Sequence, residues 1–299
     1  MTKKNESAIK SKISPVSVIL FIVLVIYVAV LVGLLVWGIL TSFKGKVEFK
    51  HNPYGFPEKW ELNIVKVMNN FKLNLEDSRG VTRDVGLPMM FLYSVLYALG
   101  CSLAFTLVQA VTAYAASRFD FWFSKVLYGI VIVTMIVPLV GTLPSELELC
   151  VKLGLYNRIF GLWIMRANFL GIYFLIFYNL FRGLPMSFTE AAKIDGASNL
   201  MIMTKIIFSL SMNTIGTVLL INFITFWNDY QTPLLYMPGY PTVSYGLYSI
   251  TIAGTSTAEL QNTPCRLATA VIVIIPILAI FFVFQKRLLG NLTVGGVKG

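Results

Sequence analysis

Residues 187–199 read SFTEAAKIDGASN, a polar segment between two long apolar stretches. Ser187 and Glu190 have the spacing of a capping box, in which the serine hydroxyl accepts from a first-turn amide and the glutamate reaches back. Gly196 can end that helix, since glycine takes the left-handed conformation of a helix C-terminus. Ser198 or Asn199 can cap a second helix. The segment predicts a helical hairpin whose alanines let a partner backbone approach, with an ordinary re-entry turn as the alternative.

The composition places the rest of the chain in a lipid bilayer. Hydrophobic residues make up 57% and charged residues 13% of the 299 residues, whereas soluble domains carry about 25% charged residues. Uncharged runs long enough to cross a membrane predict five helices. A shorter sixth run crosses only if Arg166 extends toward an interface. The predicted spans are 16–40, 85–117, 126–145, 164–182, 206–228 and 267–285.

The basic residues predict the orientation, because Lys and Arg concentrate on the cytoplasmic side of short loops. Six spans with a cytoplasmic start place the lysines before residue 16, Lys193, Lys205 and the C-terminal basic residues inside. Both termini are then cytoplasmic. We therefore expect a multi-pass protein of the cell membrane.

Several function classes find no support in the sequence. There is no GxxxxGK[ST] phosphate loop, so we expect no ATP bound by this chain. His51 is the sole histidine, and Cys101, Cys150 and Cys265 lack metal-ligand spacing. We therefore expect no catalytic residue, metal or cofactor. We expect the cysteines to be packing residues, with a Cys150–Cys265 disulfide bridge as the alternative. The basic residues form no aromatic-interleaved stripe, which argues against nucleic acid. No charged relay lies within the spans, so transport energy would come from another polypeptide.

Several motifs carry a family resemblance. EAAKIDGAS followed by an apolar span resembles the EAA signature of binding-protein-dependent ABC importer permeases. RGLP at 182–185, LGLYNRIFGLW at 153–163, FWNDY at 226–230 and the tail GNLTVGGVKG at 290–299 resemble the carbohydrate-uptake, maltose-transporter-like branch. The resemblance implies an all-α membrane protein with six transmembrane helices and the ABC type I importer permease fold.

The resemblance also implies partners and a mechanism. A homologous second permease, two cytoplasmic ATPase subunits that hold ATP and magnesium, and an extracytoplasmic sugar-binding protein would complete the importer. The segment 187–199 would dock in an ATPase cleft, and alternating access would move a carbohydrate, of oligosaccharide size, across the membrane. The coupling residues implied are Glu190, Ala191, Ala192, Asp195, Gly196 and Ala197. A further ATPase contact is implied for the tail residues Gly295, Gly296 and Lys298.

One departure from the family pattern concerns the fifth span. The pattern usually continues with a Leu-Pro pair and a second proline, but this chain has Phe208, Ser209 and Asn213. Because no proline interrupts it, we expect the fifth span to be straighter at its cytoplasmic end.

A candidate substrate pathway lies on the same span. Amide, carboxylate and aromatic groups suit sugar hydroxyls and C–H faces, and the span's outer half offers them. Trp and Tyr also favour membrane interfaces, so we favour a belt or packing role over substrate contact there. The candidates are Asn222, Thr225, Trp227, Asn228, Asp229 and Tyr230.

The expected organisation has five parts. They are a cytoplasmic tail at 1–15, a first transmembrane helix at 16–41, an extracytoplasmic loop at 42–85, a five-helix importer domain at 86–286 and a cytoplasmic tail at 287–299. The long loop either docks the binding protein or forms a lid on the protein's own outer face. Two alternatives to a sugar permease remain: an ABC permease for another solute, and a membrane scaffold or sensor that does not transport.

Overall fold

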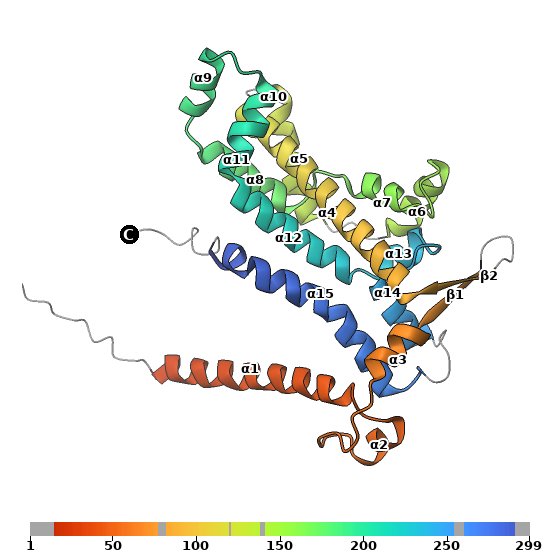
Figure 1. Ribbon diagram of the computed structural model, residues 1–299. Helices are drawn as coiled ribbons and strands as arrows, with labels where there is room; N and C mark the ends of the chain where they lie inside the picture. The colour runs from red at the N-terminus through yellow and green to blue at the C-terminus, as the bar shows by residue number, and fades with distance from the viewer. Residues whose placement is uncertain (1–14, 77–81, 120, 138–140, 254–259, 291–299) are drawn as a thin grey trace, which may run out of the picture.

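Figure 1 shows the computed structural model, which describes residues 15–76, 82–119, 121–137, 141–253 and 260–290. The described chain is mainly helical. By length and composition, three of its helices can cross a membrane: α1 (Pro15–Thr41), α4 (Leu87–Arg118) and the apolar part of α15 (Thr263–Gly290). A bent pair of helices, Asn199–Leu210 and Met212–Asn228, adds a fourth if the pair is one span. The number of six spans stays a prediction.

The predicted third span, 126–145, is wrong in its extent. Helix α5 covers Trp122–Ile136, and its C-cap residue Val137 is extended, with ψ 115°. Val137 precedes Pro138 in the sequence, and a residue before proline is pushed out of the helical region. A separate helix, α6 (Leu143–Lys152), follows with a proline in its first turn.

The predicted fourth span, 164–182, is not one continuous helix. Helix α7 (Ile159–Arg166) ends near the start of the predicted span, and α8 (Ile172–Gly183) covers most of the remainder. The five residues between them are not helical. Gly171 there has φ +124°, a backbone conformation that side-chain-bearing residues rarely adopt.

The prediction of a straight fifth span is also wrong. The short helices α10 (Asn199–Met201) and α11 (Phe208–Leu210) flank the π-helix η1 (Ile202–Ile207), and α12 (Met212–Asn228) then leaves at 80°. Ser211, at φ −100° and ψ 4°, forms the corner, and its amide donates to the carbonyls of Ile207 and Phe208. A π turn followed by a non-helical serine bends the chain without a proline.

The segment that follows α1 folds into small elements of its own. Helices α2 (Lys46–His51) and α3 (Asn63–Asn70) lead into an antiparallel hairpin of β1 (Lys72–Glu76) and β2 (Thr82–Gly86). The all-α expectation therefore has this one exception within the described residues. The remaining elements are α9 (Ser187–Ile194), α13 (Gln231–Tyr236), α14 (Val243–Tyr248) and η2 (Ser249–Ala253).

Helix α4 is the centre of the packing, because α7, α8 and α12 all lie against it. One apolar core joins its N-terminal half to the hairpin, α14 and α15. A second core joins its C-terminal half to α5, α8, α9 and η1. A third, smaller core contains Cys101 and Cys150. All three cysteines are free and buried, which favours packing over the bridge.

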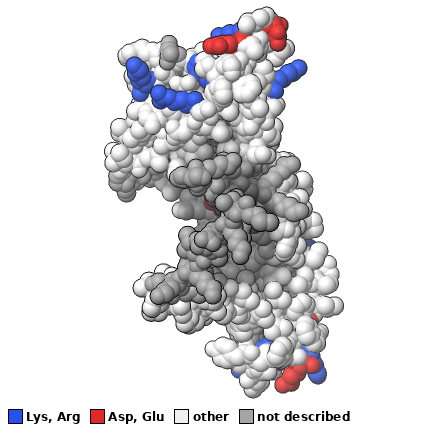
Figure 2. All heavy atoms as spheres, turned by 90° about the vertical axis from the view of Figure 1, so that its left-hand side faces the viewer, with Lys and Arg blue, Asp and Glu red and all other residues white. Residues whose placement is uncertain are grey.

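The surface shows where a bilayer would lie. In Figure 2 the visible Lys, Arg, Asp and Glu atoms gather mainly at two opposite ends of the molecule. Between those ends, the described atoms in view are almost all uncharged. We call the end that carries α9 the loop end. The opposite end, which carries α2 and α3, is called the hairpin end after the β1–β2 hairpin that follows them in the chain (Figure 1).

Asn63 provides a test of how the segment after α1 is attached. Its buried amide donates to the carbonyls of Ser42 (3.0 Å) and Lys44 (2.8 Å) just beyond α1. Asn63→Leu leaves both carbonyls without these donors and should lower the free energy of unfolding by about 2 kcal/mol. Thermal unfolding in detergent measures the loss. Asn70→Leu, at an exposed position of the same helix, is the control, and equal stability of the two variants would contradict the prediction.

Candidate functional site

Helix α9 lies at the extreme loop end, away from the body of the helices (Figure 1). It begins at Ser187, as the sequence predicts, but the predicted capping box is wrong. Met186 is the N-cap residue, and no side chain caps the helix. The amides of Thr189 and Glu190 instead donate to the Met186 carbonyl. Ser187 occupies the first helical turn rather than the cap, so its side chain is not in the capping position.

The C-terminal end of α9, the first helix of the helical hairpin at 187–199, follows the prediction. Gly196 has φ +79°, the left-handed conformation that ends a helix. The amide of Ala197 reaches back to the carbonyl of Ala192 at 2.9 Å. Ser198 then caps the next helix, because its hydroxyl accepts from the Met201 amide at 3.3 Å.

The helix α9 has one attached face and one free face. Thr189 and Ala192, three residues apart, are buried against the body, and Ala197 is half-buried in the same core. Ile194 is 87% exposed, a large value for an apolar side chain at the tip of a helix. The exposed positions on this helix and its turn are Ser187, Phe188, Glu190, Ala191, Lys193, Ile194, Asp195 and Gly196.

Aromatic rings connect the elements on either side of α9. Phe181 of α8 stacks on Phe208 of α11, with ring centroids 5.8 Å apart. Tyr114 of α4 meets both rings edge-on, at 6.1 Å from Phe181 and 6.5 Å from Phe208. Such pairs pack tightly at these separations. The helical hairpin at 187–199 therefore has both its ends fixed to the same apolar core.

The candidate pathway residues divide between two faces of α12. Asn222 is 4% exposed, and its amide donates to the Thr106 hydroxyl of α4 at 2.9 Å. Trp227 is 2% exposed, stacks on Phe223 and donates from Nε1 to the Val273 carbonyl of α15. Both side chains are directed into the protein, so packing is their role in this conformation.

The other face of α12 is exposed and carries polar groups. Thr225 and Asn228 are exposed, and each donates to the carbonyl four residues earlier on its own helix. Polar groups on the free face of a membrane helix usually face another helix or a watery path. Of the candidate pathway residues on α12, Thr225 and Asn228 are the two that face outward.

Asp229 belongs to a polar cluster that the sequence did not reveal. Its carboxylate accepts from the Tyr97 hydroxyl at 2.8 Å and from the Thr232 amide at 3.0 Å. Arg166 donates to the Thr232 hydroxyl at 2.9 Å, so a half-buried cation adjoins the group. The partners lie as far as 132 residues apart, and only the fold brings them together.

Two further residues extend this polar cluster. The Tyr236 hydroxyl lies 3.2 Å from a carboxylate oxygen of Glu146 in α6. Burial and then the nearby Glu146 charge raise the pKa of Tyr236 above its usual value. The phenol therefore keeps its proton and can donate to the carboxylate. Tyr230 lies apart, with its ring stacked on Tyr248 at 4.5 Å.

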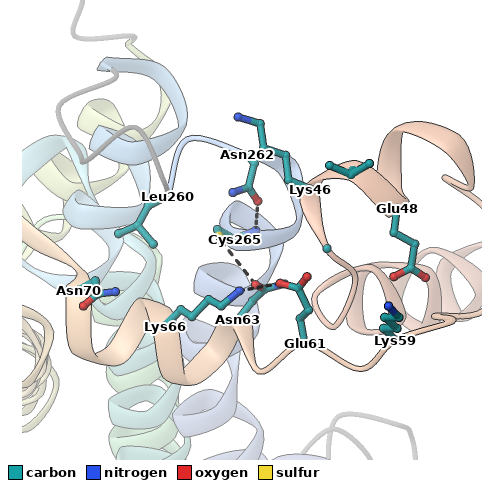
Figure 3. A pocket seen from close by; sticks show the side chains of 12 residues that line it. Lys46, Glu48, Lys59, Glu61, Asn63, Lys66, Asn70, Leu260, Asn262 and Cys265 are labelled. Atoms are coloured by element: carbon teal, nitrogen blue, oxygen red, sulfur yellow. Dashed lines mark hydrogen bonds and ion pairs between the residues drawn. The ribbon is translucent and has the colours of Figure 1, made fainter.

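The hairpin end contains a hollow of about 790 Å³ between α2, α3 and the start of α15. Figure 3 shows the Glu61–Lys66 ion pair in it, at 2.6 Å, and the Asn262 side chain accepting from the Cys265 amide. Lysines 46 and 59 and Glu48 also line it. Charges of both signs line this open hollow, and no His, Cys, Asp or Glu cluster suited to a metal occurs among the described residues.

The segment 42–85 has a packed part and an exposed part. Phe71, Leu73 and Val85 are buried in the core beside α4, as a packed lid would be. Tyr54 and Phe56 are 85% and 75% exposed, as a docking surface would be. The tail residues Gly295, Gly296 and Lys298 lie outside the described residues.

Comparison with known sequences decides the family. Residues 109–290 match the family described as binding-protein-dependent transport system inner membrane component. The chain belongs to this family. It is therefore a multi-pass protein of the cell membrane with a type I importer permease fold, and its family consists of permeases, which are generally non-catalytic.

Individual relatives agree. The chain is 31% identical over 221 residues, 73% of either chain, to an osmoprotective compounds uptake permease protein of Synechocystis sp.. It is 23% identical over 278 residues, 91% of this chain and 86% of the other, to a diacetylchitobiose uptake system permease protein of Streptomyces coelicolor. A bacterial ABC transporter involved in alginate import has a similar fold, with TM-score 0.72, 20% identity and coverage of 96% and 99% of the two chains.

Trp227 tests the division of α12 into two faces. Its ring fills the core between α4, α12 and α15, so Trp227→Ala should lower the free energy of unfolding by about 3 to 5 kcal/mol. Thermal unfolding of the purified protein measures this. Asn228→Ala, one residue further on and exposed, should leave the unfolding temperature unchanged. Equal losses in the two variants would contradict the assignment of faces.

Proposed function

We propose that this chain is the membrane-spanning permease subunit of an ATP-driven importer for a carbohydrate delivered by an extracytoplasmic binding protein. The observation that carries the proposal is α9, a short helix held by one face and free on the other, in a member of a binding-protein-dependent transport family. Ile194 and Glu190 offer a partner an apolar contact and a charge side by side. Single exposed apolar side chains are common on protein surfaces, so Ile194 supports the proposal together with the family of the chain.

The partner proposed for α9 is a cytoplasmic ATPase subunit. The sequence has no phosphate-binding loop, so the ATP that drives import is bound and hydrolysed elsewhere. The proposed coupling residues are Glu190, Ala191, Ala192, Asp195, Gly196 and Ala197, of which Ala192 and Ala197 hold the helix on the body. The stacked rings of Phe181 and Phe208 would carry movement of α9 into α8 and α11. This orientation makes the loop end cytoplasmic, with both termini inside.

Carbohydrate is the proposed substrate class for two reasons. Relatives of this chain include permeases named for diacetylchitobiose and for alpha-glucosides, the latter from Rhizobium meliloti at 28% identity. The exposed face of α12 also offers hydroxyl and amide groups at Thr225 and Asn228, which hydrogen-bond sugar hydroxyls. A second permease subunit facing this exposed face of α12 would enclose the pathway between the two chains.

The binding protein is proposed to dock at the hairpin end. The exposed aromatic residues Tyr54 and Phe56 lie on the segment after α2, outside the packed strands. The charged hollow of Figure 3 lies at the same end. Aromatic side chains beside charged groups are typical of interfaces that form and separate.

Charge reversal at Glu190 tests the coupling proposal. The side chain is exposed, so Glu190→Lys should leave the fold intact while placing a repelling charge in the ATPase contact. We expect uptake by proteoliposomes to fall at least tenfold with normal amounts of protein in the membrane. Gly196→Pro should also abolish uptake, because proline cannot adopt φ +79°.

Lys125→Glu provides the matched control for the charge reversal. Lys125 is exposed on α5, outside the helical hairpin at 187–199, and its reversal changes the net charge by two units, as Glu190→Lys does, but in the opposite direction. We expect its uptake to equal that of the unmodified protein. Normal uptake by Glu190→Lys, with the protein assembled, would remove α9 as the coupling element.

Asn228 and Asn222 together test the pathway. Asn228→Ala removes a hydrogen-bonding group from the exposed face, and one lost sugar hydrogen bond should raise the half-saturating sugar concentration of uptake about fivefold. Asn222→Ala removes a buried partner of Thr106 and should instead lower thermal stability. Uptake titrations and unfolding curves of both variants separate these effects. The opposite pattern would place the pathway on the other face of α12.

A further inference from the structure

The interruption between α7 and α8 lies at membrane depth. Its neighbour Gln109 on α4 is about 10 Å from the midpoint of that helix, counting 1.5 Å per residue. A bilayer core extends about 15 Å to each side of its centre. Backbone groups that leave a helix at this depth need partners within the protein. The residues concerned are 167–171.

Gln109 provides such a partner. Its Nε2 donates to the Leu170 carbonyl at 2.8 Å, and the side chain is fully buried. Its Oε1 has no hydrogen-bond partner among the described residues. Gly171 lies directly beside it, since a Cβ added there would be 3.5 Å from Nε2. Within the interruption, the Leu170 amide donates to the Asn168 side chain at 3.2 Å.

The two helices on either side of the interruption are attached to different ends of the molecule. Phe177 and Phe181 of α8 pack in the core that also holds α9. On α7, Trp163 donates to the Leu96 carbonyl and Arg166 to the Thr232 hydroxyl, in the polar cluster nearer the hairpin end. Helix α8 is thus fixed to the proposed coupling loop, and α7 is fixed to the opposite side.

We propose that Gln109 is a positioning residue for transport, which clamps the interruption 167–171 to α4 so that α8 and α7 move together. This rests on the proposed function. With the clamp, displacement of α9 passes through α8 and the interruption to α7 and its polar cluster. Without the clamp, the interruption absorbs the displacement. ATP hydrolysis then continues while the other end of the permease fails to follow.

The test is the ratio of ATP hydrolysed to sugar transported by the complete importer in proteoliposomes. Gln109→Leu keeps most of the volume and removes the amide, so the ratio should rise at least fivefold while ATP hydrolysis stays within about twofold. The ratio is measured per assembled transporter, so a smaller yield of folded complex does not change it. Ser102→Ala is the matched control, because Ser102 is buried on the same helix and hydrogen-bonds only its own turn, at the Leu99 carbonyl.

Gly171→Ala tests the same contact, between Gln109 and Leu170, by a change within the interruption. Its φ of +124° excludes alanine without a backbone shift, so Leu170 should move away from Gln109. We expect the same rise in the ratio, and no further rise in the double variant, because both changes break one contact. An unchanged ratio in both single variants, or hydrolysis that falls in step with uptake, would overturn the clamp. Absence of ATP-dependent sugar uptake by the unmodified importer would instead overturn the proposed function.

Discussion

Backbone amides and carbonyls at membrane depth need partners within the protein, and the architecture depends on how this chain satisfies them. Lipid offers no hydrogen bonds, so an interrupted helix is tolerated only where side chains or neighbouring turns replace the lost ones. Helix α4 provides such side chains on the face that meets α7, α8 and α12. Gln109 serves the interruption before α8, and Thr106 pairs with Asn222 on α12. The polar residues of an otherwise apolar helix therefore fix its neighbours in register.

The bend at Ser211 follows from the same constraint. The amide of Ser211 keeps hydrogen bonds to the carbonyls of Ile207 and Phe208 at the corner, where the chain changes direction by 80°. The bend lies between two parts of the chain. Before it, η1 packs in the same core as α9; after it, α12 carries Thr225 and Asn228. The position of the bend beside the stacked Phe181 and Phe208 rings joins it to the core of the loop end.

The features that depend on local sequence were predictable, and those that depend on distant contacts were not. Long uncharged runs identified α1, α4 and α15, and the glycine at 196 and the serine at 198 marked a helix end and a helix start. The corner at Ser211 contains no proline, so the pattern that predicts bends in membrane helices does not mark it. Pro138, by contrast, was a readable signal for the early end of α5. Tyr97 and Asp229 lie 132 residues apart, so no spacing could pair them.

The two faces of α12 show why residue chemistry alone does not separate a pathway residue from a packing residue. Asn222, Trp227 and Asn228 share the chemistry of a sugar site, yet helical geometry turns the first two inward and the third outward. Asn222 and Trp227 already hydrogen-bond protein groups, so a sugar would have to displace those bonds before binding there. Outward groups donate within their own helix and keep hydrogen-bonding capacity for a ligand. In a membrane helix, the direction of a polar side chain therefore separates a structural role from a transport role more sharply than its identity does.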